Sequence, residues 1–252
     1  NSEQAKAALE NMPVEVASTT TRGMPLRLRS KPTTRSVDSA DLSLLPRLPA
    51  TATELMSIAK IIGADPEKDV FLGLRANEKT VKDMKLDNVR VLAFATHGLV
   101  SGDLNGLDQP ALALSAPDVA GVDGDGLLTM GEILTLKLNA EWVVLSACNT
   151  ASADGQGAEA ISGLGRAFFY AGARSLLVSN WPVHSGATAE LTTTLFRIQT
   201  QDAVSNRAWA LQQTRLAMIE NGAQKNQAGD PLFSYAHPIF WAPFTIVGDG
   251  GG

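Results

Sequence analysis

The fold is decided by two stretches of the sequence, VRVLAFATHG at residues 89–98 and WVVLSACNT at residues 142–150. Each begins with a short unbroken run of apolar residues, which is typical of a strand buried on both faces of a parallel sheet. Residues 111–115 form a second run of this buried, parallel type. Shorter or later runs predict further strands at residues 70–73, 175–181 and 240–247.

Helical patterns fill the intervals between these strands. In residues 51–62, for example, the apolar side chains recur at a spacing that places them on one face of a helix. Further helices are expected from a cap at Asn77 or Thr80 to about Leu86, and at residues 127–138, 157–171, 186–199 and 204–221. Strands that alternate with helices predict an α/β fold with a mostly parallel central sheet and helices on both faces.

Composition excludes several classes of protein. Of the 252 residues 44% are hydrophobic and 19% charged, so the chain can bury a sizeable core. The net charge of −5 argues against non-specific nucleic-acid binding, which needs a strong basic patch. No stretch approaches about 18 uninterrupted apolar residues, so we expect no association with a membrane. The single cysteine, Cys148, fits a reducing compartment, and we expect a cytoplasmic protein.

The chain divides into three regions. We expect an N-terminal helix and flexible linker at residues 1–47, a globular domain at residues 48–249 and a disordered tail at residues 250–252. The helix would span residues 2–12, and the linker carries a basic cluster, which consists of Arg22, Arg27, Arg29, Lys31 and Arg35. This cluster fits a solvated linker, or a segment that is cleaved or docks on an acidic partner. The sequence opens on Asn1 without a visible leader, which suggests a fragment or a processed product.

Reactive side chains follow the two deciding strands. His97 comes after one strand and Cys148 after the other. Neighbouring parallel strands would bring both side chains to one edge of the sheet, where ligands and chemistry gather. An imidazole there can take the proton of the thiol and activate it as a nucleophile, and the N–H groups of Gly98 and Cys148 become candidates for an oxyanion hole. Taken alone, the cysteine also fits a small core residue, and the histidine a surface or capping residue.

Seven segments in order resemble the CHAT family, which groups with caspases, separase and gingipains among the clan CD cysteine peptidases. They are spread over about residues 45–249, which is most of the chain, and are LPATATELMSIAKIIGAD (48–65), ATHG (95–98), DGLLTMGEI (125–133), LSACNT (145–150), GAEAISGLGRAFFYAGARSLLVSNWPV (157–183), ATAEL (187–191) and HPIFWAPFTIVGD (237–249). The resemblance implies a caspase-like three-layer α/β sandwich. It also implies that His97 is the general base, that Cys148 is the nucleophile, and that Gly98 and the Cys148 amide form the oxyanion hole.

The resemblance further implies a substrate channel. Ser179, Asn180 and Trp181 resemble the strand that lines this channel, to which an extended peptide could add by β-augmentation. Ser146 stands two residues before Cys148, where basic-specific relatives often carry an acid, which weakens the case for cleavage after Arg or Lys. Three acidic residues are alternative liners of the specificity pocket, or solvated surface residues: Asp103, Asp154 and Glu159.

The resemblance therefore implies a cysteine endopeptidase that cleaves a protein substrate. Such domains are often bacterial defence effectors held as zymogens, and they are controlled by an upstream sensor, a tetratricopeptide-repeat region or a separate activator chain. Two alternatives stay open: an interaction module with a latent dyad, and a domain that processes only itself.

No cofactor is expected. The loop at residues 121–132, GVDGDGLLTMGE, matches a calcium-binding loop in part, through Asp123, Asp125 and Glu132. The first ligand position holds Gly121 in place of the usual aspartate, which favours an ordinary turn before a helix. No other spacing of histidine, cysteine or acidic residues resembles a set of metal ligands.

Overall fold

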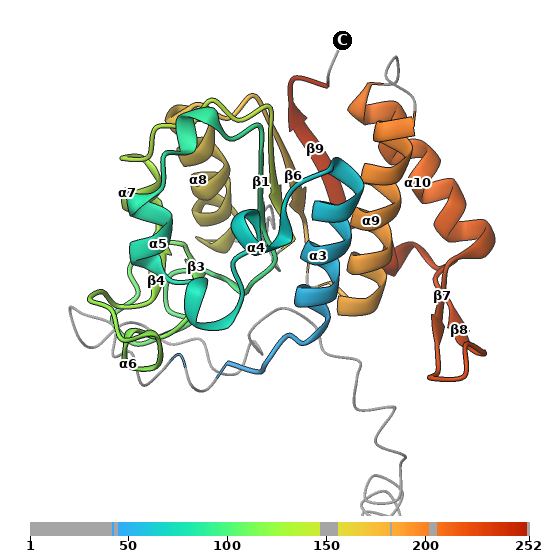
Figure 1. The fold of residues 1–252 in the computed structure, drawn as a ribbon, viewed down its shortest axis with the longest axis horizontal. Coiled ribbons are helices and arrows are strands. Elements are labelled where there is room, and N and C mark those ends of the chain that lie inside the picture. The colour runs from blue at the N-terminus through green and yellow to red at the C-terminus, as the bar shows by residue number, and fades with distance from the viewer. Residues whose placement is uncertain (1–41, 43–44, 147–155, 182, 202–205, 251–252) are drawn as a thin grey trace, which may run out of the picture.

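A central sheet with helices on both faces forms the body of the molecule in Figure 1. The structure is a computed structural model that describes residue 42 and residues 45–146, 156–181, 183–201 and 206–250. The predicted helix at residues 2–12, the basic cluster and the last two residues of the predicted tail lie outside the described residues. Within the described part, no helix is both long and apolar enough to cross a bilayer.

The central sheet has the strand order β1-β5-β6-β9. Its first three strands run parallel, and the last is antiparallel to its neighbour. These results confirm the predicted α/β fold with a mostly parallel sheet. The strands are β1 (Val91–Phe94), β5 (Trp142–Leu145), β6 (Ser175–Ser179) and β9 (Phe244–Gly248).

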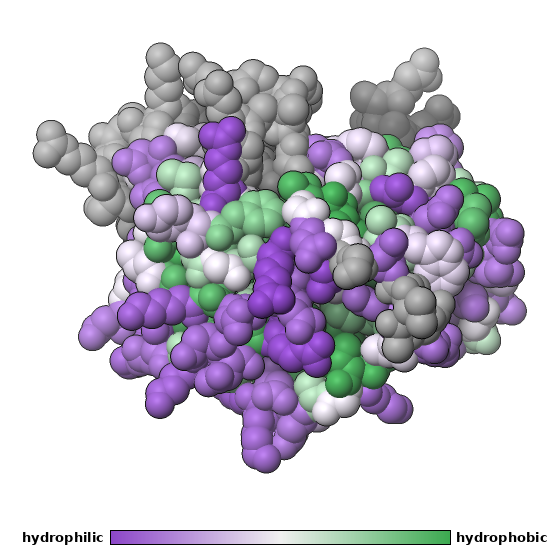
Figure 2. All heavy atoms as spheres, turned by 90° about the horizontal axis from the view of Figure 1, so that it is seen from above, coloured by the Kyte–Doolittle hydropathy of each residue, from purple (hydrophilic) through white to green (hydrophobic). Residues whose placement is uncertain are grey.

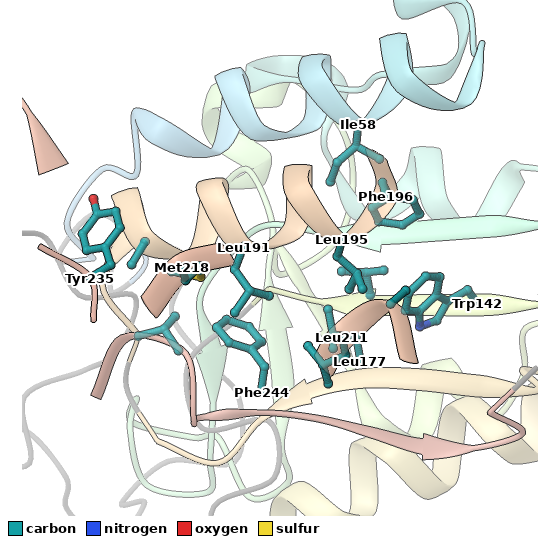
Figure 3. Close-up of a cluster of buried hydrophobic side chains, with 14 residues drawn as sticks. Ile58, Trp142, Leu177, Leu191, Leu195, Phe196, Leu211, Met218, Tyr235 and Phe244 are labelled. Carbon is teal, nitrogen blue, oxygen red and sulfur yellow. The ribbon is translucent and has the colours of Figure 1, made fainter. Parts of the chain in front are cut away.

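One face of the sheet is covered by α3 (Ala50–Ile62), α9 (Ser185–Gln201) and α10 (Arg207–Asn221), which lie together in Figure 1. Figure 3 shows Leu191, Leu195 and Phe196 of α9 pointing toward the sheet, with Ile58 of α3 above them. The Trp142 ring on β5 packs against Phe196, with ring centroids 5.1 Å apart. The predicted helices at residues 51–62 and 186–199 are thereby confirmed, and the one predicted at residues 204–221 is confirmed from Arg207 onward, with residues 204–205 outside the described residues.

The opposite face is covered by α5 (Glu78–Asp83), α7 (Met130–Ile133) and α8 (Gln156–Ala171). Phe168 of α8 is fully buried against the sheet, and Phe94 lies beside it with ring centroids 5.7 Å apart. Helix α8 ends before Gly172, which adopts a positive φ of 116° that favours glycine. The apolar cores on both faces explain why the sheet strands read as unbroken apolar runs.

A second sheet corrects two predictions. It is antiparallel and contains β2 (Gly98–Leu99), β3 (Ala111–Ala113) and β4 (Leu127–Thr129). The run at residues 111–115 is therefore not a parallel strand of the central sheet. The predicted helix at residues 127–138 is also wrong at both ends: its first residues form β4, and α7 ends at Ile133, before the predicted end. Thr129 and Glu132 form a capping box, which starts the helix three residues later than periodicity suggests.

Other connections also differ from expectation. Residues 70–72 are extended but pair with no strand of the described chain, and the 3-10 turn Gly73–Arg75 follows them. The last strand begins only at Phe244, because Pro238–Phe240 forms a 3-10 turn. A hairpin that periodicity did not indicate joins β7 (Ala223–Lys225) and β8 (Pro231–Ser234). The remaining short elements are α4 (Pro66–Asp69), Leu86–Asn88 and α6 (Pro117–Ala120).

Candidate active site

The carboxyl ends of β1 and β5 lie side by side. The two strands are parallel neighbours in which Phe94 is paired with Leu145, and the Ser146 N–H donates to the Phe94 carbonyl at 2.9 Å. His97 stands three residues after Phe94, and Cys148 three residues after Leu145. The strands are therefore adjacent, as the predicted dyad requires. Cys148 itself lies outside the described residues.

His97 is buried, with 5% of its surface exposed. Its Nε2 atom lies 2.7 Å from the carbonyl oxygen of Pro46, a residue that sequence reasoning did not single out. A carbonyl oxygen only accepts hydrogen bonds, so Nε2 carries a proton and donates it. In a neutral imidazole the lone pair is then at Nδ1. The backbone carbonyl of His97 accepts from the Ala113 N–H at 2.9 Å, which anchors the residue to the second sheet.

A base held by a third group is the geometry that nucleophilic catalysis requires. The third group fixes the tautomer and the orientation of the imidazole, so that one nitrogen is directed to the reacting atoms. Gly98, the first residue of β2, is buried beside His97 and pairs with Leu112. The assignment of its N–H to an oxyanion hole remains a prediction.

A buried carboxylate lies behind the end of β5. The Oε1 atom of Glu54 accepts from the hydroxyl of Ser146 at 2.7 Å and from the hydroxyl of Thr192 at 2.9 Å. Only 1% of Glu54 is exposed, and its two partners are also buried. Helices α3 and α9 are thereby tied to the residue two positions before Cys148. Sequence reasoning missed Glu54, although its place four residues before Ile58 puts an acid on the apolar face of α3.

The predicted substrate strand forms hydrogen bonds with β9 and the residue before it. Ser179 is buried and pairs with Phe244 of β9, and the Asn180 N–H donates to the Pro243 carbonyl at 2.8 Å. The Asn180 side chain also donates to this carbonyl, at 2.8 Å. On this edge residues 175–179 pair with β9, and the assignment of Ser179, Asn180 and Trp181 to a substrate channel stays a prediction. The Trp181 ring nitrogen donates to the Ile239 carbonyl at 3.5 Å.

The predicted acidic liners are not assembled in the described part of the site. Asp103 is buried, and its Oδ2 accepts from the Val100 N–H at 2.8 Å, which closes a turn after β2. Asp154 lies outside the described residues, as does the Glu159 side chain.

The partial calcium loop is engaged in other contacts. The Asp125 carboxylate accepts from the Leu127 N–H at 2.9 Å, while Glu132 caps α7 and pairs with Lys82 at 2.5 Å. Burial raises the pKa of Asp125 above its ordinary value. Burial would also raise the pKa of Glu132, but hydrogen bonds from Lys82 and Thr129 outweigh it and hold that pKa below its ordinary value. No group of three histidine, cysteine or acidic side chains that could hold a metal occurs within the described residues.

Comparison with known protein families identifies one family. The family model described as the CHAT domain matches residues 4–249, which is nearly the whole chain. A search of curated proteins found no match.

Proposed function

Because the chain belongs to the CHAT domain family, which is related to the caspase-like cysteine peptidases, we propose that it is a cysteine endopeptidase acting through His97 and Cys148. The observation that carries the proposal is the adjacency of β1 and β5 together with the Pro46 contact of His97. These two features support a mechanism in which a main-chain carbonyl orients His97 at the edge of the sheet where the segment that carries Cys148 begins.

The proposed reaction has two stages. The Cys148 thiol gives its proton to Nδ1 of His97, and the thiolate attacks the carbonyl carbon of the scissile peptide bond. The N–H groups of Gly98 and Cys148 stabilise the oxyanion. As the C–N bond breaks, Nδ1 returns the proton to the leaving amine, and the acyl group stays on Cys148 as a thioester. Water then gives a proton to Nδ1 and adds to the thioester, and the acid product leaves as the thiol is restored.

In this reaction Pro46 and Glu54 are positioning residues. The Pro46 carbonyl accepts from Nε2 and stabilises the imidazolium formed in each stage. Glu54 holds Ser146, and with it the main chain that leads to Cys148. We extend the proposal to a bacterial effector controlled by a sensor region or a separate activator, since regulation of this kind suits a domain whose base is almost fully buried.

The experiment that tests the proposal measures release of fluorescein from labelled, unfolded casein. We expect the wild type to release it, Cys148→Ala to release none, and His97→Ala to be slowed by at least about 100-fold, the usual contribution of a general base. Equal release by all three proteins would contradict the assignment, because it would come from a contaminant or another site.

A second candidate is an interaction module with a latent dyad, which the burial of His97 favours. Alkylation of Cys148 by iodoacetamide distinguishes the two. An activated thiolate reacts fast in the folded wild type and loses this advantage in His97→Ala, whereas a latent thiol reacts slowly in both. Self-cleavage that Cys148→Ala abolishes, without release from casein, would indicate a domain that processes only itself.

A further inference from the structure

Strand β1 has an edge that no other described strand covers. In the sheet order β1-β5-β6-β9 it lies at one end, paired with β5 alone among the described strands. The carbonyls of Arg90 and Phe94 accept from β5. Because successive residues of a strand point their polar groups to opposite sides, the N–H and C=O groups of Val91 and Ala93 face the outer edge.

A groove of about 1140 Å³ runs along this edge, and we call it the edge groove. One wall is β1, and the opposite wall is the extended segment 70–72. Helix α3 contributes Leu55 and Ile62 above, while Val81 and Met84 close it below. The groove exceeds the range of about 300–1,000 Å³ that is usual for small-molecule sites.

The shape and chemistry of the edge groove fit a strand. Its occupant would meet exposed main-chain donors and acceptors on β1 and apolar side chains both above and below. Alternate side chains of a strand point to opposite faces, so a peptide here needs apolar residues in succession and not at every second position. Natural proteins usually protect such an apolar edge, because it is a template for strand addition.

Charge favours acidic ends on this peptide. Four arginines line the groove against two carboxylates, Asp69 and Glu141. Arg90 directly precedes β1 at one end and is paired with Glu141 at 2.8 Å, while Arg47 adjoins the His97 contact at the other end. The excess of arginines over carboxylates therefore lies with the other arginines of the lining, Arg47 among them. Figure 2 shows the molecule from the side where the parallel strands begin, with hydrophobic patches among hydrophilic side chains.

We propose that the edge groove binds an extended apolar peptide of a separate protein chain, which adds to β1 as a further strand. The chain's own first 41 residues fit poorly, because their longest unbroken apolar run is Ala7–Leu9. Pro46 and His97 line the far end of the same groove, so an added strand would brace the contact that orients His97. This last consequence rests on the proposed peptidase function, whereas binding is measured without any activity.

The probe is a fluorescein-labelled nonapeptide with five consecutive valine, leucine and isoleucine residues between two pairs of glutamates. Its control has the same composition with glutamate at every second position. We expect the block peptide to bind the full chain at least tenfold more tightly in fluorescence anisotropy. Bound peptide should slow hydrogen exchange at the Val91 and Ala93 amides, which face the groove.

Two isoleucines provide matched variants. Ile62 lines the groove at the end of α3 and is 38% exposed, and Ile219 lies on α10 outside it and is 39% exposed. Ile62→Arg should weaken binding at least tenfold, while Ile219→Arg should leave it within twofold. Leu72→Arg, on the opposite wall, repeats the test should Ile62→Arg misfold.

Several results would overturn the proposal: no saturable binding, equal binding of the alternating peptide, or no effect of either groove variant. Strong protection of Val91 and Ala93 without peptide would also overturn it, since another part of this chain or a second copy would then fill the groove. Casein release by the same preparations reports separately on the peptidase.

Discussion

A single main-chain oxygen determines how His97 can act. The Pro46 carbonyl accepts a hydrogen bond from the Nε2–H group, so in the proposed reaction proton exchange falls to Nδ1. Neither the sequence spacing of His97 and Cys148 nor any motif indicated Pro46, because 51 residues separate it from His97 and it contributes only backbone atoms. The adjacency of the strands that precede His97 and Cys148 was predictable from the sequence, whereas the contact between His97 and Pro46 was not.

The Glu54 carboxylate should contribute to the free energy of unfolding through its two buried hydrogen bonds. Removal of its carboxylate in Glu54→Ala leaves the buried hydroxyls of Ser146 and Thr192 without this acceptor, and an unsatisfied buried group costs about 1–3 kcal/mol. Glu54→Gln keeps an acceptor oxygen and should lose less. Urea unfolding measures the free energy of unfolding of both variants, and the control is Glu220→Ala, which replaces an exposed residue of α10. An Ala variant as stable as this control would contradict the bridging role.

Removal of the Asp125 charge should stabilise the protein, whereas removal of the Glu54 carboxylate should destabilise it. Its pKa is raised, first by burial, so ionisation costs more in the folded than in the unfolded state. This cost is fully present above the folded pKa and vanishes below the unfolded value of about 3.9. Asp125→Asn keeps an oxygen for the Leu127 N–H and should raise the urea midpoint at pH 7. The gain should shrink as the pH falls toward 4, and a gain that does not change with pH would exclude ionisation as its cause.

The strands of the central sheet were predictable, while their partners in the second sheet were not. Residues 91–94 and 111–113 both read as short apolar strands, yet one lies in a parallel sheet and the other in an antiparallel one. Period alone does not distinguish them, because both are short unbroken apolar runs. Strand β4 was not predicted for a different reason: its Leu127 and Leu128 also fit the periodicity of the helix that follows.

The capping box sets the boundary between β4 and α7. The Thr129 hydroxyl accepts from the Glu132 N–H, and the Glu132 carboxylate accepts from the Thr129 N–H at 2.8 Å. Thr129→Ala should therefore cost about 1 kcal/mol of unfolding free energy, while Thr129→Ser should cost less. Chemical denaturation measures the difference. Equal losses in the two variants would indicate that the methyl group, and not the cap, stabilises this boundary.

On the scale of the whole molecule, the sheet joins the two parts of the chain that lead to the predicted dyad. Apolar clusters on both faces hold β1, β5 and β6 in register, so the segments after β1 and β5 start from fixed positions. The edge groove and the His97 site share one strand, β1. Regulation through this strand would need no contact with Cys148, and the sequence alone gave no sign of the groove because its walls come together only in the fold.

Cleavage profiling of a denatured proteome tests the central claim most directly. Wild type, Cys148→Ala and His97→Ala would each be incubated with it, with and without calcium, and new N-termini would be read by mass spectrometry. We predict new termini with wild type alone, in equal numbers with and without calcium, and their alignment would define the specificity pocket. The same termini from all three proteins, or none from any, would contradict a peptidase that acts through His97 and Cys148.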